Sequence, residues 1–264
     1  MQTEFSPSKN ASGRAESPVL FILMGASNLA RGYTALVNCL ARCLHPRPIE
    51  VLHAMGPGRG YCREGGVFHI VYPPIGISGL LSAAGERATN ASRVIALITD
   101  IGNDIMYNVP ASEIIFCLDG MLNDLNRMGA KIFVNPIPLV IEEDVSELQF
   151  RILRRVFFPQ SPVDYSGAAD AVREINQFLQ ESAGERIHLL PSAKDFCGAD
   201  KIHYSMLRSH KAWSNVAEAL LRELSLEKAG EVSPFSAWCA LFANMGRVFF
   251  CDMIPVRKKN PGTF

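Results

Sequence analysis

The chain has 264 residues, of which 48% are hydrophobic and 20% charged, and this length suits one large domain. Such a composition can bury a full core, so it excludes disordered, fibrous and low-complexity proteins. Lys plus Arg and Asp plus Glu both number 26, so the net charge is zero and gives no reason to expect binding to nucleic acid or to acidic lipid. We therefore expect a small or neutral substrate.

The chain begins with polar residues, and its seven cysteines show no C-x-x-C pair. Residues 1–17 lack the apolar stretch of a secretory signal, so we interpret them as a disordered leader. The cysteine spacing supports neither a zinc site nor a redox motif. Reduced thiols, a cytoplasmic location and no bound metal are the resulting expectations.

After the leader, short apolar runs alternate with stretches of helical period. The apolar runs predict five strands, over residues 19–24, 49–55, 94–99, 131–136 and 186–190. Each run is apolar on both faces, as a strand covered by helices on both sides must be. Apolar residues spaced by three and four predict helices over 114–125, 172–179 and 213–224. The pattern predicts a three-layer α/β/α sandwich around a parallel five-stranded sheet, with ligands bound beyond the carboxyl ends of the strands.

Polar residues with chemical potential follow four of the predicted strands. Ser27 follows the first, a glycine loop over residues 56–60 follows the second, Asn103 follows the third, and Asp200 and His203 follow the fifth. Acyl transfer requires these residue types: a nucleophile, a base, a group that orients the base, and donors for the oxyanion. Ser27 would be the nucleophile, His203 the base and Asp200 its orienting partner.

The expected oxyanion donors come from three places. Ser27 opens a helix, so its own N–H lies at the positive end of the helix dipole. The side-chain amide of Asn103 is the second donor, and the third is the backbone N–H of a loop glycine, where a missing side chain permits close approach.

Each of these features also has a purely structural explanation. Ser27 alone is typical of a helix N-cap, Asn103 with Asp104 is typical of a turn, and Asp-x-x-His is typical of a solvated turn. The glycines match neither phosphate-binding pattern and could simply form the loop. Catalysis is favoured because the features follow successive strands of one sheet.

The four elements, in this order, resemble those of the SGNH hydrolases, also called GDSL-like esterases and lipases. The matching residues are Gly25-Ala26-Ser27-Asn28-Leu29, a glycine loop through Gly60, Gly102-Asn103-Asp104 and Asp200-Lys201-Ile202-His203. The resemblance covers about residues 19–225 and implies Ser27 as nucleophile, His203 as base, Asp200 as its orienting group, and Gly60 and Asn103 as oxyanion donors. It implies no cofactor.

The chain departs from the family pattern at three places. Ala26 stands where the family has an aspartate that stabilises the serine turn, and Gly58 is an alternative to Gly60 as the loop donor. Tyr204 and Ser205 stand where many members have proline and asparagine, and Ser205 would make an N-cap for the final helix.

The sequence predicts a serine esterase that acts on a small-molecule ester through an acyl-enzyme on Ser27. The alternatives are an acyltransferase or carbohydrate acetyl-esterase with the same site, and a catalytically silent α/β binding module. Segments 64–77 and 138–159 are candidate walls of an acyl pocket, or else part of the core. Arg59 and Arg63 are candidates to bind an acidic substrate group, or else solvated.

Residues 230–264 form an extension to the hydrolase-like domain over residues 18–229. Five large apolar residues recur there at spacings of three and four and predict a helix over 234–249 with one aromatic face: Phe235, Trp238, Phe242, Met245 and Phe249. The uncharged stretch 232–246 is too short to span a membrane. We expect the face to dock on the enzyme itself or on a second subunit, so a homo-oligomer is one alternative.

Overall fold

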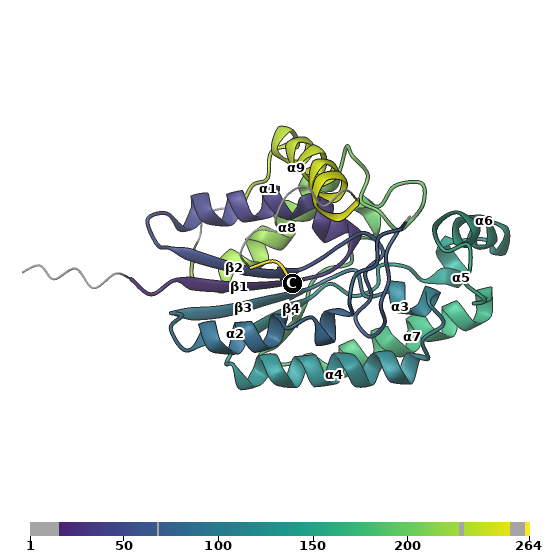
Figure 1. Cartoon of the computed structure of the whole chain (residues 1–264), viewed down its shortest axis with the longest axis horizontal. Helices are drawn as coiled ribbons and strands as arrows, with labels where there is room; N and C mark the ends of the chain where they lie inside the picture. The colour runs from purple at the N-terminus through teal and green to yellow at the C-terminus, as the bar shows by residue number, and fades with distance from the viewer. Residues whose placement is uncertain (1–15, 68, 227–229, 254–261) are drawn as a thin grey trace, which may run out of the picture.

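The computed structural model describes residues 16–67, 69–226, 230–253 and 262–264, so most of the predicted leader lies outside the described residues. Its centre is a five-stranded parallel sheet in the order β2-β1-β3-β4-β5, which confirms the predicted fold class (Figure 1). The strands are β1 (Val19–Met24), β2 (Ile49–Ala54), β3 (Arg93–Ile98), β4 (Lys131–Val134) and β5 (Ile187–Leu189). Some ends differ from prediction by one or two residues; β4 stops before Pro136, which has no N–H to donate to a ladder.

Strand β1 shows why the apolar runs form this sheet. It lies between β2 and β3, and all six of its side chains are buried. Leu20, Ile22 and Met24 pack into the core on one side of the sheet, while Val19, Phe21 and Leu23 pack into the core on the other. Alternate side chains of a strand point to opposite faces, so a strand with helices on both sides must be apolar throughout.

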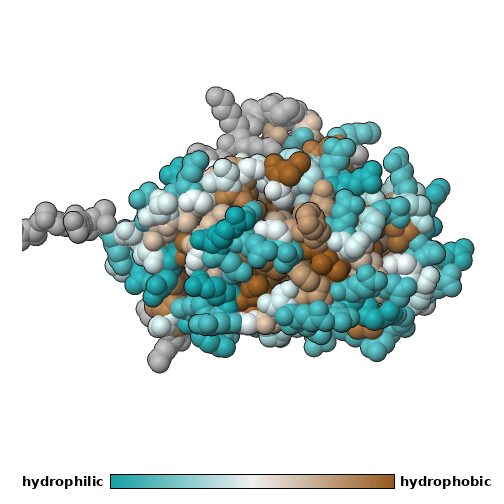
Figure 2. Space-filling view, turned by 90° about the horizontal axis from the view of Figure 1, so that it is seen from below, coloured by the Kyte–Doolittle hydropathy of each residue, from teal (hydrophilic) through white to brown (hydrophobic). Residues whose placement is uncertain are grey.

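Helices cover both faces of the sheet. On one face lie α1 (Ser27–Leu44), α8 (Ser209–Arg222) and α9 (Pro234–Arg247), and on the other lie α2 (Leu80–Ala88), α4 (Ala111–Arg127) and α7 (Tyr165–Ser182) (Figure 1). Figure 2 shows the second face, where hydrophilic residues cover most of the surface and hydrophobic ones gather between them. The helices predicted over 114–125, 172–179 and 213–224 lie mainly within α4, α7 and α8.

Shorter elements gather at the carboxyl end of the sheet. They are α3 (Asn103–Met106), α5 (Ile141–Asp144), α6 (Glu147–Phe157) and the 3-10 turns Ile75–Ile77 and Lys194–Phe196. Because every strand runs in the same direction, the loops after β1, β2, β3 and β5 meet at this one edge. The predicted site residues therefore belong to neighbouring loops.

The extension after residue 230 packs on the same body, but not through the expected face. Helix α9 lies along α1 and buries its small residues Ala237 and Ala240, which allow two helices to approach closely. The predicted aromatic face, including Phe235 at 79% exposure, remains exposed. A π-helical turn, Val248–Met253, continues α9. Within the part of the chain that the structure describes, no helix is long and apolar enough to cross a membrane.

Candidate active site

Ser27 opens α1 directly after the turn that follows β1, and it does not cap that helix. Its hydroxyl makes no hydrogen bond to any described residue, which removes the N-cap explanation. Asp100 caps the helix instead: its Oδ2 accepts the N–H groups of Ala26 (2.9 Å) and Leu29 (3.0 Å). The N–H of Ser27 itself, in the first turn, donates to no described acceptor and is available to a ligand.

Asp100 is a site residue that the sequence reasoning missed. It follows β3 in the left-handed region, with a φ of 60°, and its Oδ1 accepts a hydrogen bond from Asn28 Nδ2 (2.9 Å). Ala26 had pointed to a serine turn without a carboxylate. The structure supplies that carboxylate from the loop after the neighbouring strand, and the available signal was an acidic residue just beyond the strand beside β1.

Asp200 and His203 form the expected pair. Oδ2 of Asp200 lies 2.7 Å from Nδ1 of His203, while Oδ1 accepts the backbone N–H groups of Ile202 (3.1 Å) and His203 (2.9 Å). Partial burial alone would raise the pKa of Asp200, but the hydrogen bonds from His203 and Ile202 outweigh it and lower the pKa to about 2. The carboxylate is therefore ionised at neutral pH, and it holds the ring so that Nε2 is free to accept a proton.

Asn28 connects the serine turn to the histidine loop. Its Nδ2 donates to the carbonyl of Ile202 (3.1 Å), and its Oδ1 accepts the N–H of Tyr204 (2.9 Å). The two residues that flank His203 are thus bound to the residue that follows Ser27. Ser27 and His203 themselves share no hydrogen bond in this structure. The expectation that Ser205 caps the final helix is wrong, because α8 begins at Ser209 and the N-cap position is Arg208.

Asp104, which is fully buried, holds the segment that directly follows the glycine loop. Its carboxylate accepts the N–H groups of Tyr61 (2.6 Å), Cys62 (3.1 Å) and Arg63 (3.0 Å). Burial raises the pKa of Asp104, although these three hydrogen bonds act to lower it. Asn103, the first residue of α3, donates through Nδ2 to the carbonyl of Arg59 (3.0 Å), and the second N–H of that amide is free for a ligand.

The same contact bears on the choice between the two candidate glycines. In a trans peptide the C=O and N–H groups point in opposite directions, so the N–H of Gly60 points away from the Asn103 amide that binds the carbonyl of Arg59. With this orientation Gly60 is poorly placed to share an acceptor with Asn103. The N–H groups of Gly58, at a φ of 73°, and of Gly60 both have no described acceptor, and Gly58 stays as the alternative donor.

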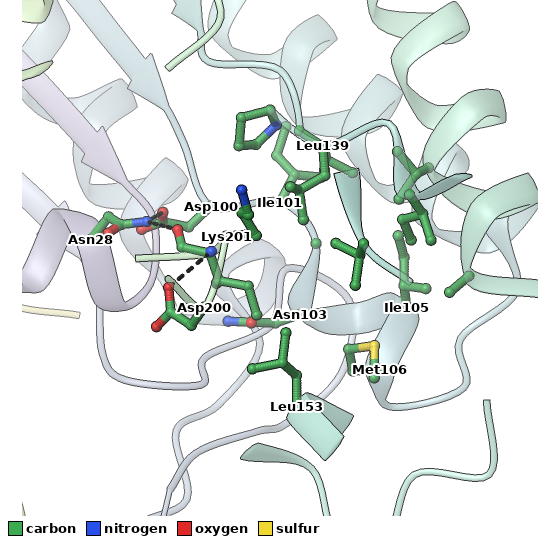
Figure 3. Close-up of a pocket in the computed structure, with 18 of the residues that line it drawn as sticks. Asn28, Asp100, Ile101, Asn103, Ile105, Met106, Leu139, Leu153, Asp200 and Lys201 are labelled. Atoms are coloured by element: carbon green, nitrogen blue, oxygen red, sulfur yellow. Dashed lines mark hydrogen bonds between the residues drawn. The ribbon is translucent and has the colours of Figure 1, made fainter. Parts of the chain in front are cut away.

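Ser27, Asn103 and Asp200 line one cavity of about 140 Å³. Its polar end is formed by Asn28, Asp100, Asn103 and Asp200, and Figure 3 shows Ile105, Met106 and Leu153 on the apolar side of it. Of the two candidate wall segments, residues 138–158 supply part of the lining and residues 64–77 supply none. Arg59 is 1% exposed and bonded to the backbone, so it is not available to an acidic substrate.

Comparisons with protein-family models and with curated protein sequences find no match to this chain. Solved structures similar to it include TesA, with 16% identity, a TM-score of 0.47, and coverage of 78% of this chain and 99% of that one. The psychrotrophic esterase EstA from Pseudoalteromonas sp. has 12% identity, a TM-score of 0.44, and coverage of 78% and 98%. A lipolytic protein of the G-D-S-L family from Desulfitobacterium hafniense has 14% identity, a TM-score of 0.40, and coverage of 86% and 98%. Likeness at this level does not extend to the chemistry of the site, so function has to be argued from this chain's own residues.

Proposed function

We propose that this chain is a serine esterase that hydrolyses a carboxylic ester through an acyl-enzyme on Ser27. The observation that carries the proposal is that Ser27, free of any capping role, lies on one cavity with the Asn103 amide and with Asp200, the partner of His203. Ser27 starts a helix, lines a largely apolar cavity and makes no side-chain hydrogen bond, so its hydroxyl is suited to act as a nucleophile.

The reaction proceeds in two steps, acylation of Ser27 and hydrolysis of the acyl-enzyme. Ser27 Oγ attacks the ester carbonyl carbon while its proton passes to Nε2 of His203, and the proton then goes to the departing alcohol. Water attacks the acyl-enzyme by the same route and releases the acid. The developing oxyanion accepts hydrogen bonds from the N–H of Ser27, the N–H of Gly58 and Nδ2 of Asn103. The serine–histidine contact, which this structure does not contain, forms with substrate bound.

The cavity favours an acyl group larger than acetyl. An apolar cavity of roughly 150 Å³ holds a benzene-sized molecule of six carbons, and this cavity has a volume of about 140 Å³. An acetyl group would leave most of the apolar wall uncovered, so a carbohydrate acetyl-esterase fits the site less well. An acyltransferase would use the same site with another hydroxyl in place of water.

All seven cysteines are free thiols, and we keep a reducing, cytoplasmic location as part of the proposal. Among the described residues, no group of three His, Cys, Asp or Glu side chains is placed to hold a metal ion. The proposed chemistry uses only the chain's own groups.

The test is hydrolysis of p-nitrophenyl esters with acyl chains from acetate to decanoate, together with labelling by a fluorophosphonate. We expect turnover and labelling, with kcat/KM highest at a chain of about six carbons. Absence of both turnover and labelling in the folded protein would leave the silent binding module as the better account.

A further inference from the structure

The C-terminal segment returns to the sheet beside the glycine loop. Strand β2 lies at the edge of the sheet, and residues 262–264 pair with it in parallel (Figure 1). The N–H of His53 donates to the carbonyl of Gly262 (2.9 Å), and the N–H of Phe264 donates to the carbonyl of His53 (3.0 Å). The glycine loop begins three residues after His53. Residues 262–264 therefore bind β2 close to the point where the chain leaves this strand and enters the loop.

Arg59 links the returning segment to the Asn103 amide. Its guanidinium donates through Nη1 to the carbonyl of Phe264 and through Nε to the carbonyl of Pro73 (2.9 Å). The backbone carbonyl of the same residue accepts the hydrogen bond from Asn103. Burial lowers the pKa of Arg59 to about 10, which still leaves it charged at neutral pH. Arg59 thus contacts the C-terminal segment through its side chain and the proposed oxyanion donor, Asn103, through its backbone carbonyl.

A second contact joins the extension to the start of the loop. The hydroxyl of Tyr72 donates to Asp252 Oδ2 (2.7 Å), which also accepts from Arg247 Nη1 (2.7 Å). A Cβ added at Gly56 would lie 2.6 Å from Cζ of Tyr72, so the ring lies directly on the first glycine of the loop. The guanidinium of Arg59 also lies over the Tyr72 ring, with its Cζ 5.9 Å from the ring centroid.

These four residues, Arg59, Tyr72, Arg247 and Asp252, are called the Arg59 cluster below. It places two arginines and one carboxylate mostly out of water, with the Asp252 side chain 2% exposed. Removing such charges from water costs free energy that their attraction often fails to recover, so stability alone is a weak reason for them. A role in fixing the geometry of the loop accounts better for their position.

We propose that the C-terminal extension positions the oxyanion site through the Arg59 cluster. Arg59 and Tyr72 are positioning residues in this account, since neither lines the cavity. The kinetic consequence rests on the proposed esterase function, whereas the structural consequence, a glycine loop held by the extension, does not.

The kinetic test is Tyr72→Phe, which removes only the hydroxyl that binds Asp252. We expect kcat to fall about tenfold with KM changed less than about twofold, because a displaced oxyanion donor weakens transition-state binding alone, and by less than the loss of a whole donor. Tyr33→Phe is the matched control: the ring centroids of Tyr33 and His53 lie 4.4 Å apart with the rings tilted by 58°, and the Tyr33 hydroxyl has no partner among the described residues. Unchanged kcat in Tyr72→Phe, or equal effects of the two variants, would overturn the proposal.

Arg59→Lys provides a second variant, because lysine keeps the charge but cannot bind the two carbonyls in the geometry of the planar guanidinium. Arg127→Lys, at an exposed position at the end of α4, is its control. In both Tyr72→Phe and Arg59→Lys, amide hydrogen exchange over residues 58–63 should quicken by about tenfold or more, with exchange in β1 unchanged. This readout does not need esterase activity: if the wild-type protein proves inactive, the proposed function fails, and unchanged exchange in the loop separately overturns the positioning role.

Discussion

The two ends of the cavity are built in different ways. The polar end is fixed by hydrogen bonds among four loops, with Asp100, Asp104 and Asn28 each binding a loop other than its own. The apolar end depends on side-chain packing by α5, α6 and α7, and α6 buries only Phe150 while Leu148, Ile152 and Val156 are exposed. Hydrogen bonds fix direction and packing does not, so the geometry of the chemistry is more strictly specified than the fit of the substrate.

The largest expected effect comes from removing the proposed nucleophile at the polar end. Ser27→Ala should lower kcat/KM for the best ester by at least ~10³-fold and abolish fluorophosphonate labelling. The melting temperature should shift by less than about 2 °C, because the hydroxyl has no hydrogen bond to lose. Labelling of the variant at the wild-type rate would show that another residue is the nucleophile.

The next effect concerns the proposed base, His203, and its partner Asp200. His203→Ala should reduce kcat by ~10³-fold, close to the loss in Ser27→Ala, while Asp200→Asn should retain more activity, at a loss of about 10²-fold. An orienting group is less essential than the base that it orients. Wild-type activity in His203→Ala, measured on the same ester, would remove His203 from the mechanism.

The Asp200–His203 pair should also make the free energy of unfolding depend on pH in the acid range. The pKa of Asp200 is about 2, below the roughly 3.9 of an unfolded aspartate, so the ionised carboxylate stabilises the folded state above pH 4. That contribution is lost as the pH falls from 4 toward 2. Urea denaturation should therefore find wild type more stable than Asp200→Asn at neutral pH, with the gap narrowing below pH 4; a gap that widens in acid would contradict the sign.

A smaller loss is expected at the helix cap. Asp100→Ala leaves the N–H groups of Ala26 and Leu29 without their acceptor and should lower the free energy of unfolding by about 2 kcal/mol. Because the serine turn moves with the cap, kcat should fall as well. Asp195→Ala, at an exposed position, is the control and should change neither quantity. A cap variant as stable and as active as the control would mean that the turn needs no carboxylate.

The smallest effect is expected at the apolar end. Leu153→Trp should narrow the cavity and lower kcat/KM for a hexanoyl ester about tenfold relative to an acetyl ester. Leu148→Trp lies on the exposed side of the same helix and should leave the ratio unchanged. Equal ratios in the two variants would show that the acyl group binds elsewhere.

The sequence was sufficient for the sheet and for the rim of polar residues, because both follow from local patterns: strands apolar on both faces, and Ser27, Asn103, Asp200 and His203 in the segments that follow strands. It was insufficient where a contact joins distant residues. Asp100 caps a helix that starts 73 positions earlier, and Arg59 owes its burial in part to Phe264, 205 residues away. The docking face of α9 also depended on its neighbour, since α1 accepts small side chains and leaves the aromatic ones outside.

The origin of the carboxylate at the serine turn has a consequence for how such a turn can be recognised in other chains. A linear search pattern that demands aspartate immediately before the serine rejects this chain at Ala26. A three-dimensional template that asks only for a carboxylate oxygen about 3 Å from the two amide nitrogens of the turn would accept it, whichever strand carries the acid. This predicts that chains with such a turn carry aspartate either directly before the serine or after the neighbouring strand, and seldom at both positions.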